Sequence, residues 1–313
     1  MRKNHKLLTI FLTLATLNIA LLFLFKENNV IKESNNDKPD FHLESTEGIT
    51  QISMISDTLN VMLSKANNKW LVNNNYELDP NMKAVLFSVL KDVRVQRAVN
   101  NTQKKKLASQ GKINGTHVKI MQGDKILRDF FAFGDANNQR SYFLNATSEE
   151  PYLVHLPGYE SYVTGIFGVN PNDWRNRYLI KSTWETIKEI SINNVAHPQE
   201  EIKIKADGRL FSIDGVANLN TEKMMAYIEG ITNMQAIRFI NKPQNLGDDK
   251  LIMSIKIDDA QQKNNCQIEI FAFADDKTKQ YLLVKNKSTY AIIDQNTLNG
   301  LIQNKQAFEQ EKN

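Results

Sequence analysis

Cysteine is nearly absent from this chain of 313 residues, since Cys266 is its only cysteine. One thiol excludes an intramolecular disulfide framework and a cysteine-based zinc site. Cys266 falls in an alternating strand pattern, which favours a small buried hydrophobe over a reactive thiol. Histidine is also scarce, and the five histidines lie far apart in the sequence. No local spacing therefore brings two of them together as metal ligands.

The sequence also lacks a glycine-rich phosphate loop and a nucleophile elbow. Three aspartate doublets fall where the pattern predicts loops between strands, and aspartate is common there because it suits turn geometry. These pairs are Asp248-Asp249, Asp258-Asp259 and Asp275-Asp276. We therefore expect no catalytic residue, no metal and no cofactor, and we interpret the chain as non-enzymatic.

Positive charge is in small excess. The formal net charge is +4 and is spread along the chain, whereas a nucleic-acid-binding protein needs lysine and arginine clustered on one element. We therefore expect no nucleic-acid partner. The basic run Lys104-Lys105-Lys106 lies between predicted elements and indicates a solvated loop, with contact to an acidic lipid or a partner as the alternative.

What the sequence does contain is one pattern that occurs twice. Residues 40–177 reappear, degenerate but collinear, as residues 178–308. Phe130-Phe131-Ala132-Phe133 returns as Ile270-Phe271-Ala272-Phe273, and the other matches keep nearly the same offset. A period this long indicates duplicated domains and not the short units of a solenoid.

Each copy follows the same order of predicted elements: a strand pair, a hairpin, one amphipathic helix and a four-stranded meander. Asp79 followed by Pro80 marks the start of the first helix, and Asn220 marks the start of the second. Strands outnumber helices, which predicts an α+β fold of two tandem domains. Each domain is a mostly antiparallel sheet with one long amphipathic helix.

The N-terminus predicts a membrane anchor. Arg2, Lys3 and Lys6 precede an uncharged apolar run from Leu7 to Phe25, and about 20 apolar residues suffice for a helix to cross a bilayer. A cleaved signal peptide is the alternative, but no small-x-small site follows the run. The positive residues before the span predict a single-pass inner-membrane protein with the bulk of the chain in the periplasm.

These patterns divide the chain into five parts. A polar stretch after the span reads as a flexible tether, and a short polar tail follows the second copy. The parts are a cytoplasmic tip and transmembrane anchor (1–26), the tether (27–39), repeat domain 1 (40–177), repeat domain 2 (178–308) and the tail (309–313).

Two arginines are retained in register between the copies. Arg97 and Arg238 each follow the long helix, inside a largely apolar segment. A stem packed along the core needs a partner for its guanidinium, so we expect each to pair with a carboxylate or carbonyl of its own domain. Binding of an anionic ligand is the alternative.

Two tryptophans lie near the predicted domain boundary. Trp174 falls in Trp174-Arg175-Asn176-Arg177, and Trp184 follows shortly after. We interpret Trp174 as packing the two copies together, with an exposed recognition aromatic as the alternative.

The chain carries a set of structural motifs: Lys69-Trp70, Arg97, Ala132 to Asp135, Tyr142, Leu144 and Trp174-Arg175-Asn176-Arg177. Together these motifs resemble those of a bacterial family known as the domain of unknown function 4340, in two tandem copies. The resemblance implies a membrane-anchored envelope protein, because family members look like such proteins. It also implies a link to transport, because the domain occurs with the auxiliary, non-ATPase subunits of GldG-type ABC transporters. The family has no established catalytic residues to carry over.

Two functions are compatible with this sequence. The first is a non-enzymatic envelope protein, anchored in the inner membrane, that acts through protein–protein contacts as accessory or scaffold for a transporter or a gliding-type assembly. The alternative is a periplasmic glycan- or peptide-binding module. It would use a groove between the two repeats, lined by Trp174, Trp184 or nearby tyrosines.

Overall fold

A computed structural model describes residues 40–159, 162–208, 210–243, 250–272 and 280–310. From His42 onward the chain forms one compact unit. The predicted span from Leu7 to Phe25, the tether, and the doublets Asp248-Asp249 and Asp275-Asp276 lie outside the described residues. Within the described ranges, no helix has the length and apolar character needed to cross a membrane.

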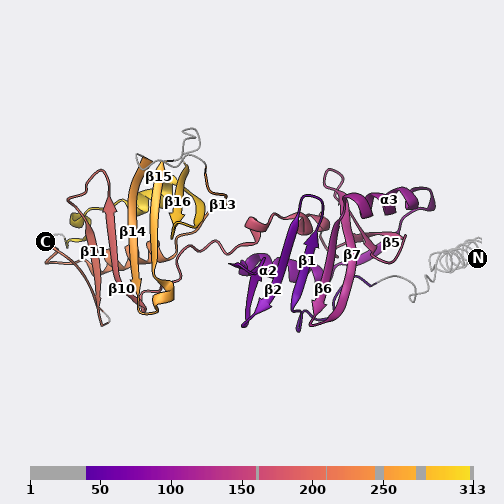
Figure 1. Cartoon of the computed structure of the whole chain (residues 1–313), viewed down its shortest axis with the longest axis horizontal. Coiled ribbons are helices and arrows are strands. Elements are labelled where there is room, and N and C mark those ends of the chain that lie inside the picture. Colours follow the sequence, from indigo (N-terminus) through magenta and orange to yellow (C-terminus); the bar gives the residue numbers. More distant parts are fainter. Residues whose placement is uncertain (1–39, 160–161, 209, 244–249, 273–279, 311–313) are drawn as a thin grey trace, which may run out of the picture. The chain divides into compact units, whose positions relative to one another are not determined.

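The first half of the unit is built on a nine-stranded antiparallel sheet (Figure 1). Its strand order is β4-β3-β2-β1-β6-β7-β8-β9-β5, so β4 and β5 are its edges. The strands are β1 (Gln51–Ile55), β2 (Asn60–Ala66), β3 (Lys69–Val72), β4 (Tyr76–Glu77), β5 (Arg94–Ala98), β6 (Thr116–Gln122), β7 (Lys125–Asp135), β8 (Arg140–Asn145) and β9 (Pro151–His155).

The second half carries an eight-stranded antiparallel sheet of order β12-β11-β10-β14-β15-β16-β17-β13. This order matches that of the first sheet strand for strand, with β4 as the one additional strand of the first. The strands are β10 (Ile187–Asn194), β11 (Ile202–Asp207), β12 (Leu210–Ile213), β13 (Arg238–Ile240), β14 (Leu251–Asp259), β15 (Cys266–Ala272), β16 (Gln280–Lys285) and β17 (Thr289–Asp294).

The strands form where apolar and polar residues alternate. In β11, Ile202 and Ile204 are buried and the lysines between and after them face outward. The turns between strands use residues that tolerate a positive φ. Gly208 has φ +64° after β11, and Asn67 and Asn68 have φ 50° and 62° between β2 and β3.

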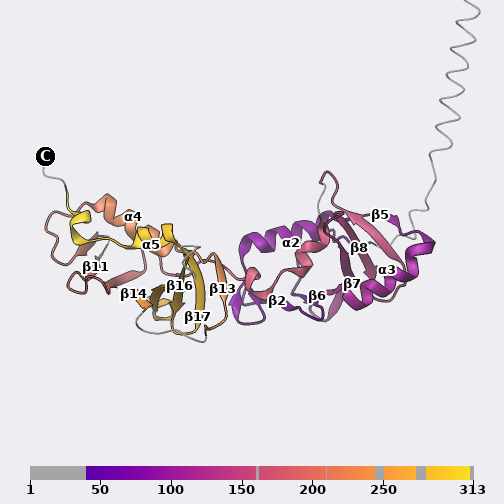
Figure 2. The ribbon, with the colours of Figure 1, turned by 90° about the horizontal axis from the view of Figure 1, so that it is seen from above.

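One long helix follows the first hairpin in each half, as the sequence predicts. Asp79 caps α2 (Pro80–Asp92), because its side chain accepts the backbone N–H groups of Asn81 and Met82. Asn220 caps α4 (Thr221–Thr232) through the N–H of Lys223. Figure 2 shows α4 and α5 (Gln295–Leu301) on the same side of the second sheet. The apolar face of α4 joins the buried isoleucines of the strands in one core.

The first half contains a second long helix that the sequence analysis did not predict. Lys104-Lys105-Lys106 lies in α3 (Asn101–Asn114), not in a loop. The helix buries only Ala108 and Gly111, so it carries almost no apolar stripe. Gly111 lets α3 approach the sheet, because a Cβ there would lie 2.5 Å from the ring of Phe133.

Short 3-10 helices complete the fold. Two of them matter for the site, namely η2 (Pro171–Trp174) before Arg175 and η4 (Gln262–Asn264) after β14. The others are η1 (Val163–Gly168) and η5 (Lys305–Phe308).

Candidate binding cleft

A cleft of about 810 Å³ opens beside the segment that joins the two halves, residues 169–186, here called the joining segment. Its lining comes from β3, β4, the joining segment, β13, η4 and the β16–β17 hairpin. Among the described residues of this lining, five side chains are cationic and one is a carboxylate. They are Lys69, Arg175, Lys181, Lys263 and Lys285, with Glu77 as the carboxylate. Such an excess of one charge in a concave surface concentrates ions of the opposite sign.

Arg175 is part of this lining and is only 7% exposed. Its guanidinium carbon is 3.6 Å from the ring centroid of Tyr76 and 3.8 Å from that of Phe239. Nη1 donates to Asn172 Oδ1 at 3.2 Å, while Nε is buried and donates to no acceptor among the described residues. Burial lowers the pKa of Arg175, but a guanidinium stays charged in proteins.

The backbone of the joining segment fixes this arginine. Asp79 N donates to the carbonyl of Trp174 at 2.9 Å, and Asn176 N donates to the carbonyl of Glu77 at 2.7 Å. On the other side, Ala236 N donates to the carbonyl of Arg177 at 2.9 Å. The segment is therefore hydrogen-bonded both to the start of α2 and to the chain after α4.

Glu77 occupies one end of the cleft between two lysines. Its Oε2 lies 2.9 Å from Lys181 Nζ, and its Oε1 lies 3.6 Å from Lys69 Nζ. The hydrogen bond from Lys181 is the main cause that lowers the pKa of Glu77. The carboxylate is therefore ionised at neutral pH and links β4 to the joining segment.

Lys285 in β16 is the partly buried cation of the cleft. Its Nζ donates to the carbonyl of Leu179. Burial lowers the pKa of Lys285, while Cys266 raises it and Lys181 lowers it further. Among the described residues, Lys285 has no carboxylate partner.

A buried carboxylate holds the rim of the cleft. Asp259 is 2% exposed, and it accepts Thr186 Oγ1 at 2.6 Å and the backbone N–H of Gln261 at 2.7 Å. Burial by itself raises the pKa of Asp259, but hydrogen bonds led by that of Thr186 lower it overall. Asp259 thus ties the joining segment to the loop that carries Lys263.

The predicted tryptophans do not line this cleft. Trp174 is fully buried, and its Nε1 donates to the carbonyl of Val169 at 3.1 Å. Trp184 is 50% exposed and lines a separate cleft of about 520 Å³ beside α4. Of the aromatic groups expected in a groove between the repeats, Tyr76 and Tyr178 do line the main cleft.

Arg97 and Arg238 occupy corresponding edge strands, opposite Leu153 of β9 and Ile292 of β17. Both are exposed. Arg238 Nη2 donates to Gln280 Oε1 at 3.4 Å, and Arg97 makes no hydrogen bond or ion pair within the described ranges. Arg238 therefore meets a side-chain carbonyl of its own half, as expected, although the contact is long and exposed. For Arg97 the expected carboxylate or carbonyl partner is wrong. On the open edge of a sheet, water solvates the guanidinium and no protein partner is needed.

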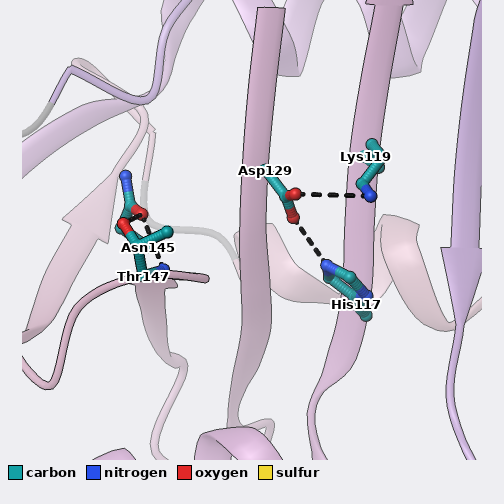
Figure 3. A network of polar contacts seen from close by, with 5 residues as sticks. All are labelled: His117, Lys119, Asp129, Asn145 and Thr147. Atoms are coloured by element: carbon teal, nitrogen blue, oxygen red, sulfur yellow. Dashed lines mark hydrogen bonds and ion pairs between the residues drawn. The ribbon is translucent and has the colours of Figure 1, made fainter. Parts of the chain in front are cut away.

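A polar network on the face of the first sheet accounts for one of the histidines (Figure 3). His117 Nε2 lies 2.6 Å from Asp129 Oδ1, and Lys119 Nζ lies 3.5 Å from Asp129 Oδ2. These residues come from the paired strands β6 and β7. Asn145 Oδ1 accepts separately from the backbone and hydroxyl of Thr147. In the part of the chain that the structure describes, no group of three or more His, Cys, Asp or Glu residues could hold a metal ion.

Sequence reasoning missed most of the cleft. Arg175 stood inside the Trp-Arg-Asn-Arg motif, which was the one available signal, whereas Glu77, Lys181 and Lys285 belong to no motif. The fold and the cleft together define a sheet-rich α+β protein with a positively charged cleft at the joining segment.

This chain belongs to the family described as a domain of unknown function (DUF4340), whose model matches residues 70–251 and so more than half of the chain. The match includes the Arg175 segment and parts of both sheets. No curated protein and no solved structure matches the chain.

Proposed function

We propose that this protein is a non-enzymatic binding protein of the bacterial envelope, which holds a partner molecule in the cleft at the joining segment. The observation that carries the proposal is the lining of five cations and one carboxylate, contributed by both halves of the chain. The cleft volume of about 810 Å³ lies within the usual range of ligand sites, roughly 300–1,000 Å³.

Two of the cations are positioned before any ligand arrives, which favours binding. Arg175 is stacked on two rings, and Lys285 donates to a backbone carbonyl. Groups that are already ordered lose little conformational freedom when a ligand binds. Fixed positive charge in a concave site also accelerates the approach of an anionic partner.

The cellular setting is part of the same proposal. The apolar run from Leu7 to Phe25, preceded by basic residues, supports a single inner-membrane span with the bulk of the chain in the periplasm. The shared strand order of the two sheets supports two tandem copies divided near Arg177. An anchored protein with a preformed cleft suits an accessory or scaffold role in a transporter or gliding-type assembly.

Site-specific crosslinking in intact cells tests the proposal. A photo-crosslinking residue at Lys263, which is exposed at the rim of the cleft, is compared with one at Lys205 on β11, outside the cleft. We expect adducts at position 263 that disappear when Arg175→Met is added, and none at position 205. If adducts form at a residue on the edge strand β5, such as Arg97, and not at position 263, the partner docks on a sheet edge and the cleft proposal is wrong.

A topology reporter tests the setting separately. A periplasm-specific reporter fused at the C-terminus should be active, and the protein should remain with the membrane at its full mass. Activity of a cytoplasm-specific reporter, or loss of the first residues from the mature chain, would contradict the anchor.

A further inference from the structure

Glu77 shows which chemistry the cleft accepts. It is the one carboxylate among the described lining residues. It lies between Lys69 and Lys181, within 3.6 Å and 2.9 Å of their ammonium nitrogens. Both lysines are exposed, with side chains 63% and 58% accessible. A carboxylate from outside can therefore reach the same ammonium groups.

We infer that the cleft binds an acidic, extended peptide segment, whose carboxylates are held by Lys181, Lys263 and Lys285 around Arg175, and that Glu77 is an internal competitor for one of these positions. This inference rests on the proposed function, since it names the partner of the same cleft.

The first support for an acidic ligand is that several cations of the cleft have no anionic partner in the described part of the chain. Lys263, Lys285 and Arg175 have no carboxylate partner within the described ranges, although Arg175 is nine-tenths buried and Lys285 is partly buried. Cations withdrawn from water without a counterion carry a desolvation cost that an anion can offset. The unpaired, buried Nε of Arg175 is a donor of the same kind.

The distribution of the cations is the second support, because it favours a chain over a single ion. Lys181 comes from the joining segment, Lys263 from η4, and Lys285 from β16. A peptide with several acidic side chains can meet cations from three separate elements at once. Amide side chains of the same lining suit the peptide groups of such a segment, and they belong to Asn75, Asn176, Gln261 and Asn264. Basic clusters recognise acidic motifs in this way in other domains.

Fluorescence anisotropy with a labelled oligoglutamate peptide tests the inference on the full-length chain in a non-ionic detergent. An uncharged Gly/Ser peptide of the same length is the reference ligand. We expect oligoglutamate to bind, the neutral peptide not to bind, and the affinity to fall as salt is added. Binding of both peptides alike would overturn the inference.

Matched lysine variants locate the site. Lys181→Gln and Lys285→Gln should each weaken oligoglutamate binding by roughly tenfold, the value of one charge-assisted hydrogen bond. Lys205→Gln is the control, because Lys205 also pairs with a carboxylate at 2.8 Å and is 47% exposed, but lies outside the cleft. If Lys285→Gln does not fold, Lys263→Gln on the exposed η4 replaces it. Equal effects of the cleft variants and Lys205→Gln would overturn the inference.

Glu77→Gln should change the binding affinity in the opposite direction to the lysine variants. Removal of the internal carboxylate should tighten oligoglutamate binding several-fold, because Lys181 and Lys69 are then free to meet the ligand. If Glu77 only supported the shape of the cleft, this variant would weaken binding, and the competitor role would be wrong.

Other anions separate this inference from the proposed function. Polygalacturonate, an acidic glycan, and inorganic phosphate are titrated against the same variants. Binding of polygalacturonate or phosphate without oligoglutamate, with the same dependence on Lys181 and Lys285, overturns the peptide and leaves the cleft as a binding site. Absence of binding by all three, together with no adduct at position 263 in cells, overturns both.

Discussion

Arg175 lies over the ring of Phe239, with its guanidinium carbon 3.8 Å from the ring centroid, and the same carbon lies 3.6 Å from the ring centroid of Tyr76. Tyr76 belongs to β4 of the first sheet and Phe239 to β13 of the second. A desolvated cation over an aromatic face contributes up to about 2 kcal/mol. One planar side chain therefore contacts both halves and also presents charge to the cleft.

Replacement of Arg175 by lysine should separate shape from charge. An ammonium keeps the charge but cannot lie flat between two rings, so we expect Arg175→Lys to lower the free energy of unfolding by about 1–2 kcal/mol. Urea denaturation measures the change. Arg97→Lys, on an exposed edge strand, is the control and should stay within about 0.5 kcal/mol of the wild type. An unchanged midpoint for Arg175→Lys would show that the stacking contributes nothing to stability.

The ion pair of Glu77 and Lys181 should show a small, pH-dependent coupling. Because Lys181 is exposed, a double-mutant cycle of Glu77→Gln and Lys181→Gln should give about 0.2–1 kcal/mol at neutral pH. The folded pKa of Glu77 lies below its unfolded value. Its contribution is therefore fully present above the unfolded pKa, and it is lost as pH falls through the folded value. A coupling that persists at pH of about 2 would contradict this assignment.

Much of the fold follows from local sequence signals. The alternation in β11 and the caps Asp79 and Asn220 are local, so the hairpins and both long helices were predictable. The helix α3 was not, because it has little apolar periodicity and packs through Gly111 against Phe133. Contact with the finished sheet, which the sequence does not show, decides its conformation.

The cleft was less predictable than the fold. The register of the two copies drew attention to Arg97 and Arg238, which the structure places on exposed edge strands. The cleft instead brings together Glu77, Lys181 and Lys285, which lie far apart in the sequence. A lysine in a strand pattern looks the same whether it faces bulk solvent or other cations, so only the folded chain identifies this group.

A buried hydrogen bond in the second half should matter for stability and not for the ligand. Tyr227 Oη donates to the carbonyl of Leu301 at 2.7 Å, and burial raises the pKa of Tyr227, so its proton is retained. Tyr227→Phe leaves this buried acceptor unpaired and should cost about 1–3 kcal/mol by thermal or urea unfolding. Tyr290→Phe is the control, since Tyr290 makes a longer, exposed bond of 3.3 Å to Lys287 and should change stability by less than about 0.5 kcal/mol. Equal costs for the two variants would refute the role of burial.

The affinity for oligoglutamate should fall at alkaline pH because Lys285 loses its proton. Burial and the neighbouring Lys181 lower the pKa of Lys285, and Cys266 opposes them. Lys285 therefore loses its proton at a lower pH than an ordinary lysine, whose pKa is about 10.4. Between the folded and the unfolded pKa of Lys285, the unfolded chain binds more protons than the folded chain, so the free energy of unfolding rises with pH. Over the same range the folded protein loses the positive charge of Lys285 that would meet the ligand.

Anisotropy titrations of oligoglutamate from neutral pH up to about pH 10, just below the pKa of an ordinary lysine, measure the effect in the full-length chain. We expect the wild-type affinity to decline before exposed lysines deprotonate. Lys285→Arg, which stays charged throughout, should remove the early decline and leave the affinity at neutral pH within a few-fold. If the two proteins lose affinity along the same curve, Lys285 does not meet the ligand, and the decline belongs to another group of the cleft.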